Sequence, residues 1–395
     1  MDSERYQICP YVRSSCAMPD FDAILQSLLF PPRHCAVDLA FLLLHAGNPF
    51  WSENAGHSNH HTGARAAVLM ECGKFWRDGI KSMEISVVIP TYNRNALLKK
   101  TLQGLCEQTR LESLKEVIIV SDGSIDATAG TVKEFLARLP IKFLEQPKRG
   151  VTRARNLGLR EVKTSIVLLL DDDVIPDRQL VAEHVTFHTQ MPTSEAVLQG
   201  YVTWLPELRI THFMRWYGEF GGLFGFSLLK DGQEADARYL YTCNISFKTD
   251  FLRAQGGFNE TLTVLEDHEL GYRLSRQGMK MFFRRTAVGY HNQTFTFEEA
   301  CTRLRSYSVG LRAFNATDAG REMSKRNARL SFRLAKIGAR VMVFIFYPLR
   351  FLLDSDVRLP NAVYRLFYWY YATHRAFWSR AGAQDSLDQA NIFVK

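Results

Sequence analysis

Three consecutive acids, Asp171, Asp172 and Asp173, are the residues of this sequence with the clearest chemical potential. They directly follow the apolar run 166–170, which is typical of a buried strand in a parallel sheet. The acids therefore fall at the carboxyl end of that strand, where open α/β sheets bind their ligands. Adjacent carboxylates repel one another, and a divalent cation such as Mg²⁺ or Mn²⁺ would make the arrangement favourable. A solvated acidic turn explains the triplet equally well, so the rest of the chain has to decide.

A second group of acids, Glu266, Asp267 and Glu269, opens an expected helix. Carboxylates in a first helical turn interact favourably with the helix dipole, which is the purely structural explanation. The group exceeds what capping requires, and one member could act as a general base toward an acceptor hydroxyl. His291 follows an apolar stretch further along the chain. A single histidine more often has a structural role, but this imidazole could complete a metal site beside the acidic triplet.

Two further segments follow expected strands and could hold a nucleotide. Asp122 comes after the strand 117–120, where a carboxylate can accept hydrogen bonds from a base or ribose, although it could also merely begin a turn. Arg149, followed by a glycine, precedes a helix that carries Arg155 and Asn156. A glycine turn ahead of a basic helix N-terminus suits a diphosphate. Alternatively, the arginines of this helix are solvated surface charge.

The order of these segments is more specific than any one of them. In chain order they are Val88-Ile89-Pro90-Thr91-Tyr92-Asn93-Arg94, Val120-Ser121-Asp122-Gly123-Ser124, Arg149-Gly150 with Ala154-Arg155-Asn156-Leu157-Gly158, Leu170-Asp171-Asp172-Asp173, Cys243-Asn244-Ile245-Ser246 with Gly256-Gly257-Phe258, and Glu266-Asp267. This pattern resembles the family 2 glycosyltransferases of GT-A fold, over roughly residues 84–300. Two positions depart from the family: Ser121 replaces the first acid of the usual Asp-Asp-Gly-Ser, and Glu269 stands where an aspartate usually follows. The second change leaves the acceptor contacts open.

The resemblance implies a nucleotide-sugar donor, with UDP, GDP or dTDP as the nucleotide, and a single displacement that inverts the anomeric centre. It implies that Asp267 is the catalytic base and that Glu266 supports it. It also implies an Mg²⁺ or Mn²⁺ ion held by Asp171 and Asp173, with Asp173 as the direct ligand, and His291 is our further candidate for this metal. The residues expected to contact the donor are Pro90, Tyr92, Asn93, Asp122, Arg149, Arg155, Asn156, Asp171 and Asp172.

Strands and helices alternate between residue 84 and about residue 300, which predicts βαβ units in an α/β fold. We expect a Rossmann-like, mostly parallel central sheet flanked by helices, as in the GT-A type. The expected strands are 85–89, 117–120, 142–144 and 166–170, and the expected helices are 95–108, a helix capped by Asp126 that runs to Leu139, and 152–161. We divide the chain into an N-terminal appendage (1–82), a GT-A catalytic domain (84–300) and a basic, aromatic-rich helical region (301–395).

The composition is that of an ordinary globular protein, with 46% apolar and 23% charged residues. The seven cysteines have no metal-ligand spacing and the first residues lack a signal-peptide layout. We therefore expect reduced thiols and a cytoplasmic location. No apolar stretch approaches the ~20 residues that span a bilayer. His57, His60 and His61 could bind a metal, but a solvated loop is the commoner outcome for such a segment.

The net charge of +8 is concentrated near the C-terminus, because residues 302–380 hold 15 Lys and Arg against 4 Asp and Glu. Arginines interleave with aromatic residues in 338–353 and 364–378. This pattern favours interfacial helices, and hence peripheral contact with the cytoplasmic membrane face through 338–378. These helices could instead pack on the catalytic domain. Membrane contact would bring the site close to a lipid-linked hydroxyl acceptor, in the assembly of a surface polysaccharide or glycolipid.

Two other functions have weaker support in the sequence. A nucleotidyltransferase of related sheet architecture would carry a glycine-rich basic loop directly after the first strand, where this chain has Pro90-Thr91-Tyr92-Asn93-Arg94. A basic nucleic-acid-binding protein would account for the C-terminal charge. The acids of the core argue against that function for the whole protein, so we expect no nucleic-acid partner.

Overall fold

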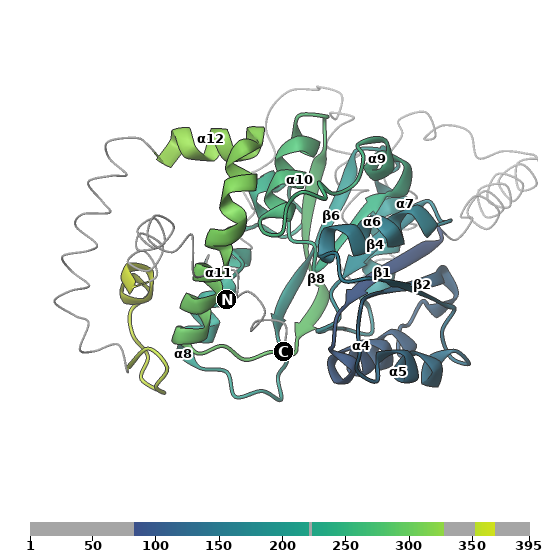
Figure 1. Ribbon diagram of the computed structural model, residues 1–395, viewed down its shortest axis with the longest axis horizontal. Coiled ribbons are helices and arrows are strands. Elements are labelled where there is room, and N and C mark those ends of the chain that lie inside the picture. The colour runs from purple at the N-terminus through teal and green to yellow at the C-terminus, as the bar shows by residue number, and fades with distance from the viewer. Residues whose placement is uncertain (1–82, 221–222, 328–351, 368–395) are drawn as a thin grey trace, which may run out of the picture. The chain divides into compact units, whose positions relative to one another are not determined.

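The computed structural model describes residues 83–220, 223–327 and 352–367, all within one compact unit, Ile80–Lys395 (Figure 1). They form one eight-stranded sheet in the order β3-β2-β1-β4-β7-β6-β8-β5. The strands are β1 (Ile85–Thr91), β2 (Leu114–Asp122), β3 (Ile141–Gln146), β4 (Ile166–Leu170), β5 (Val174–Pro176), β6 (Ala196–Trp204), β7 (Asn244–Lys248) and β8 (Lys280–His291). The helices are α4 (Asn95–Cys106), α5 (Thr128–Phe135), α6 (Val151–Glu161), α7 (Leu180–Gln190), α8 (His212–Glu219), α9 (Thr249–Ala254), α10 (Glu266–Ser275), α11 (Phe297–Ala316) and α12 (Asp318–Asn327).

Helices cover both faces of the sheet, and this explains why the strands are apolar at successive positions. In β4, Ile166 and Leu168 pack in one cluster with residues of α4, α5 and α7. Val167 and Leu169 point to the other face and pack with residues of α6, α9 and α10. Figure 1 shows α4 and α5 on one side of the strands and α9 and α10 on the other. The sheet is therefore the middle layer of three.

The expected mostly parallel arrangement is confirmed for the first half of the sheet. β3, β2, β1 and β4 run parallel to one another. β7 runs antiparallel to both β4 and β6, and β5 runs antiparallel to β8, whereas β6 and β8 are parallel. Because β1, β2 and β4 point the same way, their carboxyl ends at Thr91, Asp122 and Leu170 meet at one edge of the sheet.

The helix after β2 differs from the prediction. We expected Asp126 to cap a helix that reaches Leu139, but α5 covers only Thr128–Phe135, and its N-cap residue, Ala127, makes no side-chain cap. Asp126 accepts hydrogen bonds from the backbone nitrogens of Thr128 (3.1 Å) and Asn95 (3.0 Å), so it ties the start of α5 to the start of α4. The helix ends early because Leu139 precedes a proline, which disfavours the α conformation.

Part of the C-terminal region packs against α8 and α11. Tyr364 and Phe367 are buried together with aromatic residues of α8 and α11. The Tyr364 ring stacks on Trp216 at 5.8 Å, and the Phe367 ring meets Phe297 edge-on at 6.0 Å. We expected Tyr364 and Phe367 at lipid headgroup depth; they belong to the core instead, because neighbouring aromatic rings already cover them.

The rest of 338–378 lies outside the described residues, as do His57, His60, His61 and the whole expected appendage 1–82. Within 83–220, 223–327 and 352–367, none of the helices combines the length and the hydropathy that crossing a bilayer requires. The expected start of a helical region after residue 300 agrees with α11 and α12. The three-part domain division itself stays a prediction.

Candidate active site

The acidic triplet lies in the turn between β4 and β5, and an arginine faces two of its carboxylates. Arg94 Nη1 donates to Asp172 Oδ1 at 3.1 Å and to Asp173 Oδ2 at 2.9 Å. Thr91 Oγ1 donates to the second oxygen of Asp172 at 2.8 Å. Asp172 and Asp173 are each only 4% exposed. The triplet is therefore not a solvated turn. Arg94 offsets part of the repulsion between the carboxylates, which we expected a cation to offset.

Asp172 is the member of the triplet most deeply built into the fold. Its backbone oxygen accepts a hydrogen bond from Thr101 Oγ1 at 2.8 Å, which ties the turn to α4. Burial raises the pKa of its carboxyl, the charge of Arg94 opposes that shift, and Asp173 adds to it. Every oxygen of this side chain already has a donor, so Asp172 shapes the turn more than it offers a ligand.

Arg155 joins the first acid of the triplet to the second acidic group. From α6 its Nη2 donates to Asp171 Oδ1 and its Nη1 donates to Glu266 Oε1, each at 2.9 Å. The Arg155 side chain is only 5% exposed, and its guanidinium lies 5.5 Å from the centre of the Phe258 ring. Burial opposes its charge, but the two carboxylates outweigh burial and raise its pKa. Arg155 is therefore not solvated surface charge; it holds the end of β4 beside the start of α10.

The first turn of α10 presents Glu266 and Asp267 in different electrostatic environments. Burial and the charge of Asp267 raise the pKa of Glu266. Burial opposes ionisation of Asp267, but the charge of His268 and hydrogen bonds from its ring (3.0 Å) and backbone nitrogen (2.8 Å) outweigh burial and lower the Asp267 pKa. Neighbouring carboxyl groups with pKa values shifted in opposite directions are typical of acid–base sites. Asp267 is ionised at neutral pH and able to accept a proton.

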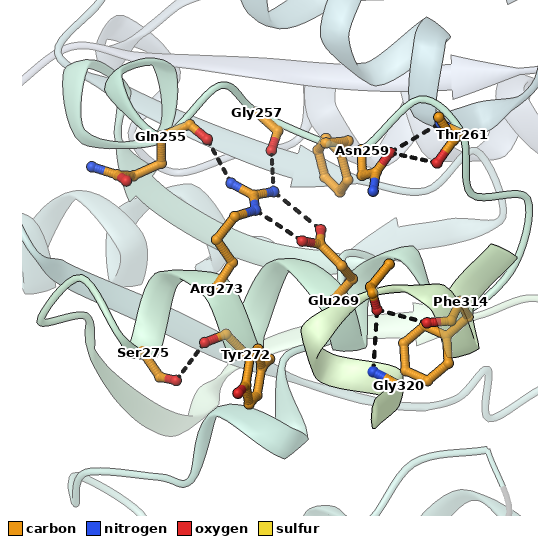
Figure 2. Close-up of polar contacts among 12 residues, drawn as sticks. Gln255, Gly257, Asn259, Thr261, Glu269, Tyr272, Arg273, Ser275, Phe314 and Gly320 are labelled. Carbon is orange, nitrogen blue, oxygen red and sulfur yellow. Dashed lines mark hydrogen bonds and ion pairs between the residues drawn. The ribbon is translucent and has the colours of Figure 1, made fainter. Parts of the chain in front are cut away.

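The backbone just before α10 is strained. Leu265 has a φ of 57°, a left-handed conformation that costs free energy in a residue with a branched side chain. Further along the helix, Arg273 links Glu269 to the loop that precedes α10, as Figure 2 shows. Arg273 pairs with Glu269 at 2.9 Å and also donates to the carbonyl oxygens of Gln255 and Gly257. Glu269 thus anchors the helix start and is not a second candidate base.

Asn156 supports the same loop from the other side. Its Nδ2 donates to the Phe258 carbonyl oxygen at 2.9 Å, and its Oδ1 accepts from the Phe258 nitrogen at 2.8 Å. We expected Asn156 beside the donor, but its amide is used in these contacts and it lines neither of the cavities described below. Its placement favours a role in positioning the loop before α10.

A cavity of about 350 Å³ opens where β1, β2 and β4 end. Most of the residues expected to contact the donor line it: Pro90, Tyr92, Asn93, Asp122, Arg155, Asp171 and Asp172. Arg149 does not line it; its neighbour Lys148 does, with the ammonium group 4.3 Å from the centre of the Tyr92 ring. Lys148 was not expected from the sequence, because the sequence does not show which of two adjacent basic side chains points into the cavity.

We call this cavity the donor cavity, because most of the residues expected to contact the donor line it. The Asp122 carboxylate closes one of its sides. Its oxygens accept from the backbone nitrogens of Arg149 (2.7 Å) and Gly150 (2.8 Å), and from Gln146 Nε2 (2.7 Å). The residue that follows must be glycine, because Gly123 has a φ of 80° and a Cβ there would lie 2.8 Å from the Lys148 nitrogen. Asp122 therefore does more than begin a turn, since it fixes a loop from a distant part of the chain.

A second cavity of about 480 Å³ contains Glu266, Asp267 and His291. It shares Val151, Arg155 and Asp171 with the donor cavity, so the two cavities meet at the end of β4. Aromatic side chains form much of its wall: Tyr217, Phe224, Tyr241 and Tyr307. None of these was expected from the sequence, and only Tyr217 and Phe224 belong to a segment dense in aromatic residues, 213–226.

Asp173 and His291 fit one side of a metal site. His291 Nε2 lies 3.7 Å from Asp173 Oδ2, while Asp173 Oδ1 and His291 Nδ1 are buried without a hydrogen-bond partner. Burial lowers the pKa of His291 although the charge of Asp173 opposes the shift, so the imidazole is neutral, as a metal ligand must be. Across the part of the chain that the structure describes, no group of three or more His, Cys, Asp or Glu side chains forms a metal cage, and Asp171 faces Arg155. Mg²⁺ commonly binds through one or two side chains plus phosphate oxygens, which suits such a partial site.

Residues 86–252 match the family model of glycosyl transferase family 2. The chain carries a family 2 glycosyltransferase domain. Over 240 residues it is 32% identical to validoxylamine A glucosyltransferase of Streptomyces hygroscopicus subsp. limoneus, a match to 52% of this chain and 51% of that protein. Over 238 residues it is 28% identical to chondroitin synthase of Escherichia coli, a match to 53% of this chain and 34% of that protein.

The GT-A fold expected for residues 84–300 is confirmed by a solved structure. The mannosyltransferase PcManGT from Pyrobaculum calidifontis, in complex with GDP-Man and Mn²⁺, superposes with a TM-score of 0.53 over 82% of this chain and 96% of its own, at 17% identity. The chain spans about half the length of validoxylamine A glucosyltransferase and about a third of chondroitin synthase. The family match ends at residue 252, before Glu266, Asp267 and His291.

Proposed function

We propose that this protein is an inverting, metal-dependent glycosyltransferase that moves a sugar from a nucleotide-sugar donor to a hydroxyl acceptor. The observation that carries the proposal is the shared wall of the two cavities. Arg155 and Asp171 line both, with the nucleotide-binding segments on one side and the ionised Asp267 on the other. A donor in the first cavity therefore presents its sugar at the junction, within the cavity that contains a base.

The chemistry needs a base on the face of the sugar opposite the leaving diphosphate. Asp267 accepts the proton of the acceptor hydroxyl while the hydroxyl oxygen forms a bond to the anomeric carbon. The bond from that carbon to the phosphate oxygen breaks, and its electron pair leaves with the diphosphate. Asp173 and His291 would hold a divalent cation, which stabilises the negative charge of the leaving group. Glu266, held by Arg155, keeps the first turn of α10 in register with the donor cavity.

The names of similar proteins support this proposal. Validoxylamine A glucosyltransferase and chondroitin synthase are named for sugar transfer and glycan synthesis. The Pyrobaculum calidifontis mannosyltransferase structure contains both a nucleotide sugar and Mn²⁺. For the acceptor we propose a saccharide or lipid-linked saccharide used to build a surface polysaccharide or glycolipid.

The test is a donor screen with full-length protein. UDP-, GDP- and dTDP-sugars are each added with Mn²⁺, with Mg²⁺ or with a chelator, and both thermal protection and donor hydrolysis are measured. We expect one nucleotide class to protect the protein, and only with a cation. The proposal fails if no donor protects the protein or is hydrolysed. Release of pyrophosphate from a nucleoside triphosphate and a sugar phosphate would support the nucleotidyltransferase instead.

We further propose a cytoplasmic protein with peripheral membrane contact through part of 338–378. The structure changes how this is tested, because Leu353, Tyr364 and Phe367 are buried in the core and must be kept. Full-length protein is compared with a chain that ends at Phe367, in co-sedimentation with anionic and with neutral liposomes. We expect only the full-length protein to bind, and only anionic liposomes at low salt. Equal binding by both chains, or none by the full-length protein, contradicts the proposal.

A further inference from the structure

Besides Arg94 and Arg155, a third arginine belongs to the site. Arg303 lines the second cavity, the one that contains Asp267, and its partners differ from those of Arg94 and Arg155. Arg94 and Arg155 each pair with two carboxylates. Arg303 forms no ion pair with any carboxylate among the residues that the structure describes. Its Nε donates to the Tyr307 hydroxyl, one helical turn further along α11, at 3.2 Å. The remaining nitrogens of its guanidinium are therefore not committed to a fixed anion of the fold.

The surroundings place Arg303 on the metal side of the cavity. Its guanidinium lies 5.8 Å from the centre of the Phe295 ring. Phe295 in turn stacks on His291, with ring centres 6.0 Å apart and an interplanar angle of 20°. Arg303 is close enough to Asp173 and to His291 for its charge to act on both. An anion bound beside Asp173 and His291 would thus lie near this guanidinium.

We propose that Arg303 binds the β-phosphate of the nucleoside diphosphate, on the other side of the phosphate from the cation held by Asp173 and His291. The inference rests on the proposed function. When the bond from the anomeric carbon to the phosphate oxygen breaks, its electron pair stays on the β-phosphate, and the N–H groups of Arg303 donate to that charge. Guanidinium groups suit this role because their planar donors match phosphate oxygens. Tyr307 orients the guanidinium through its hydroxyl.

This assignment explains why α11 contributes to the site although it lies beyond residues 86–252, the span of the family match. An arginine that pairs with no carboxylate, in a cavity rich in acids, would otherwise hold a partly buried charge without a counterion. The leaving diphosphate is the anion that the proposed reaction brings to this position. It carries more charge after transfer than before, so the contact strengthens as the reaction proceeds.

The test compares nucleoside diphosphates with monophosphates in the presence of Mn²⁺. UDP, GDP, dTDP and the corresponding monophosphates are titrated calorimetrically into wild-type protein and into Arg303→Gln. Hydrogen bonds to charged groups are worth roughly 1.5–3 kcal/mol, so we expect diphosphate affinity to fall about 10- to 100-fold. Monophosphate affinity is expected to stay unchanged, since a monophosphate has no β-phosphate. Arg312→Gln is the control, because it removes the same charge from an exposed position of the same helix.

Two outcomes would overturn the assignment. The first is an unchanged ratio of diphosphate to monophosphate affinity in Arg303→Gln. The second is an effect confined to the KM of the acceptor, which would mean that Arg303 binds the acceptor and not the β-phosphate. If the wild-type protein binds none of the diphosphates, the proposed function fails, and this inference with it. If Arg303→Gln does not fold by thermal melting, Tyr307→Phe replaces it. We then expect a smaller loss, about 2- to 10-fold and confined to diphosphates, because Arg303 keeps its charge and loses only the hydrogen bond that orients it.

Discussion

The donor side and the acceptor side of this site are built in different ways. On the donor side, the Asp122 carboxylate binds backbone nitrogens at Arg149 and Gly150, and Gly123 leaves room for that approach. On the acceptor side, side chains from separate elements meet, as Arg155 and Glu266 do, within an aromatic wall. Contacts to backbone require particular residues at fixed spacing and so leave short sequence motifs. An aromatic wall can be made in many ways and leaves none, which agrees with a family match that stops at residue 252.

The most direct way to separate the two sides is Asp267→Asn. This change keeps the shape of the side chain and removes the proposed base, so we expect turnover to fall by about 10²- to 10⁴-fold. Donor binding is expected to stay unchanged, because the proposed base acts on the acceptor hydroxyl and not on the nucleotide. Initial rates and the thermal shift given by the nucleoside diphosphate measure the two effects. Asp250→Asn, at an exposed position of α9, is the control; near-normal turnover in Asp267→Asn would transfer the base role to Glu266.

Arg155 belongs to both sides, and its removal tests how far they depend on one another. Arg155→Met leaves Asp171 and Glu266 without their partner, and breaking a buried pair costs about 3–5 kcal/mol. Arg94→Met is the matched comparison: its partners Asp172 and Asp173 are also buried, but the Arg94 side chain is 43% exposed, so water can replace part of its contact and we expect a smaller loss. Urea denaturation gives the free energy of unfolding of each variant. Equal losses in the free energy of unfolding would show that the burial of the arginine side chain does not decide how much its ion pairs stabilise the fold.

The proposed metal site on the donor side is tested with Asp173→Ala. We expect the variant to lose the part of its stabilisation by nucleoside diphosphate that depends on Mn²⁺, about 2.7 kcal/mol when the ligand is at a hundred times its Kd. The reason is that Asp173 Oδ1 is a buried carboxylate oxygen without a hydrogen-bond partner. Thermal melting with and without Mn²⁺ measures the loss, with Asp250→Ala as control. A cation-dependent shift of wild-type size in Asp173→Ala would remove Asp173 from the metal site.

The smallest effect concerns the loop that Asn156 holds on the acceptor side. Gly256 and Gly257 both have positive φ, so alanine at either costs about 1 kcal/mol in backbone strain. A Cβ on Gly257 would also lie 2.5 Å from Asn156 Oδ1, whereas a Cβ on Gly256 meets nothing within 4 Å. We therefore expect Gly257→Ala to lower the free energy of unfolding more than Gly256→Ala, by roughly another 1 kcal/mol. Equal values would mean that the loop moves away from Asn156 at little cost.

The fold was most predictable where both faces of a strand are apolar. β4 begins at Ile166 and ends at Leu170, as expected from the run of aliphatic residues. β7 was not expected, although it is buried at every position, because Asn244 and Ser246 interrupt its apolar pattern. His184 makes these polar groups tolerable: its ring nitrogens bond Ser246 at 2.7 Å and Asn244 at 2.9 Å. No local pattern reveals partners that lie about sixty residues away in the chain.

The site was predictable in its acids and not in what surrounds them. The sequence pattern singled out Asp171, Asp173 and Asp267. In the structure Asp171 lines both cavities, Asp267 lines the second, and Asp173 pairs with Arg94 of the first. The sequence pattern did not indicate that Arg94 and Arg155 would pair with these acids, because a motif gives residue types at each position and not the direction of a side chain. Arg303 was hidden for a further reason: in the sequence it counts only toward the basic charge of residues 302–380, and nothing there marks it as a site residue.

The position of Arg155 between Asp171 and Glu266 would couple the two proposed binding events. A cation that recruits Asp171 in addition to Asp173 and His291 would have to compete with the guanidinium for the same carboxylate oxygen, which lies 2.9 Å from Arg155 Nη2. The protein without nucleotide would then hold the cation weakly. A diphosphate that accepts hydrogen bonds from the displaced guanidinium would offset the lost ion pair, so nucleotide and cation would each raise the affinity of the other by the same factor. One side chain would thereby make the loading of donor and metal cooperative.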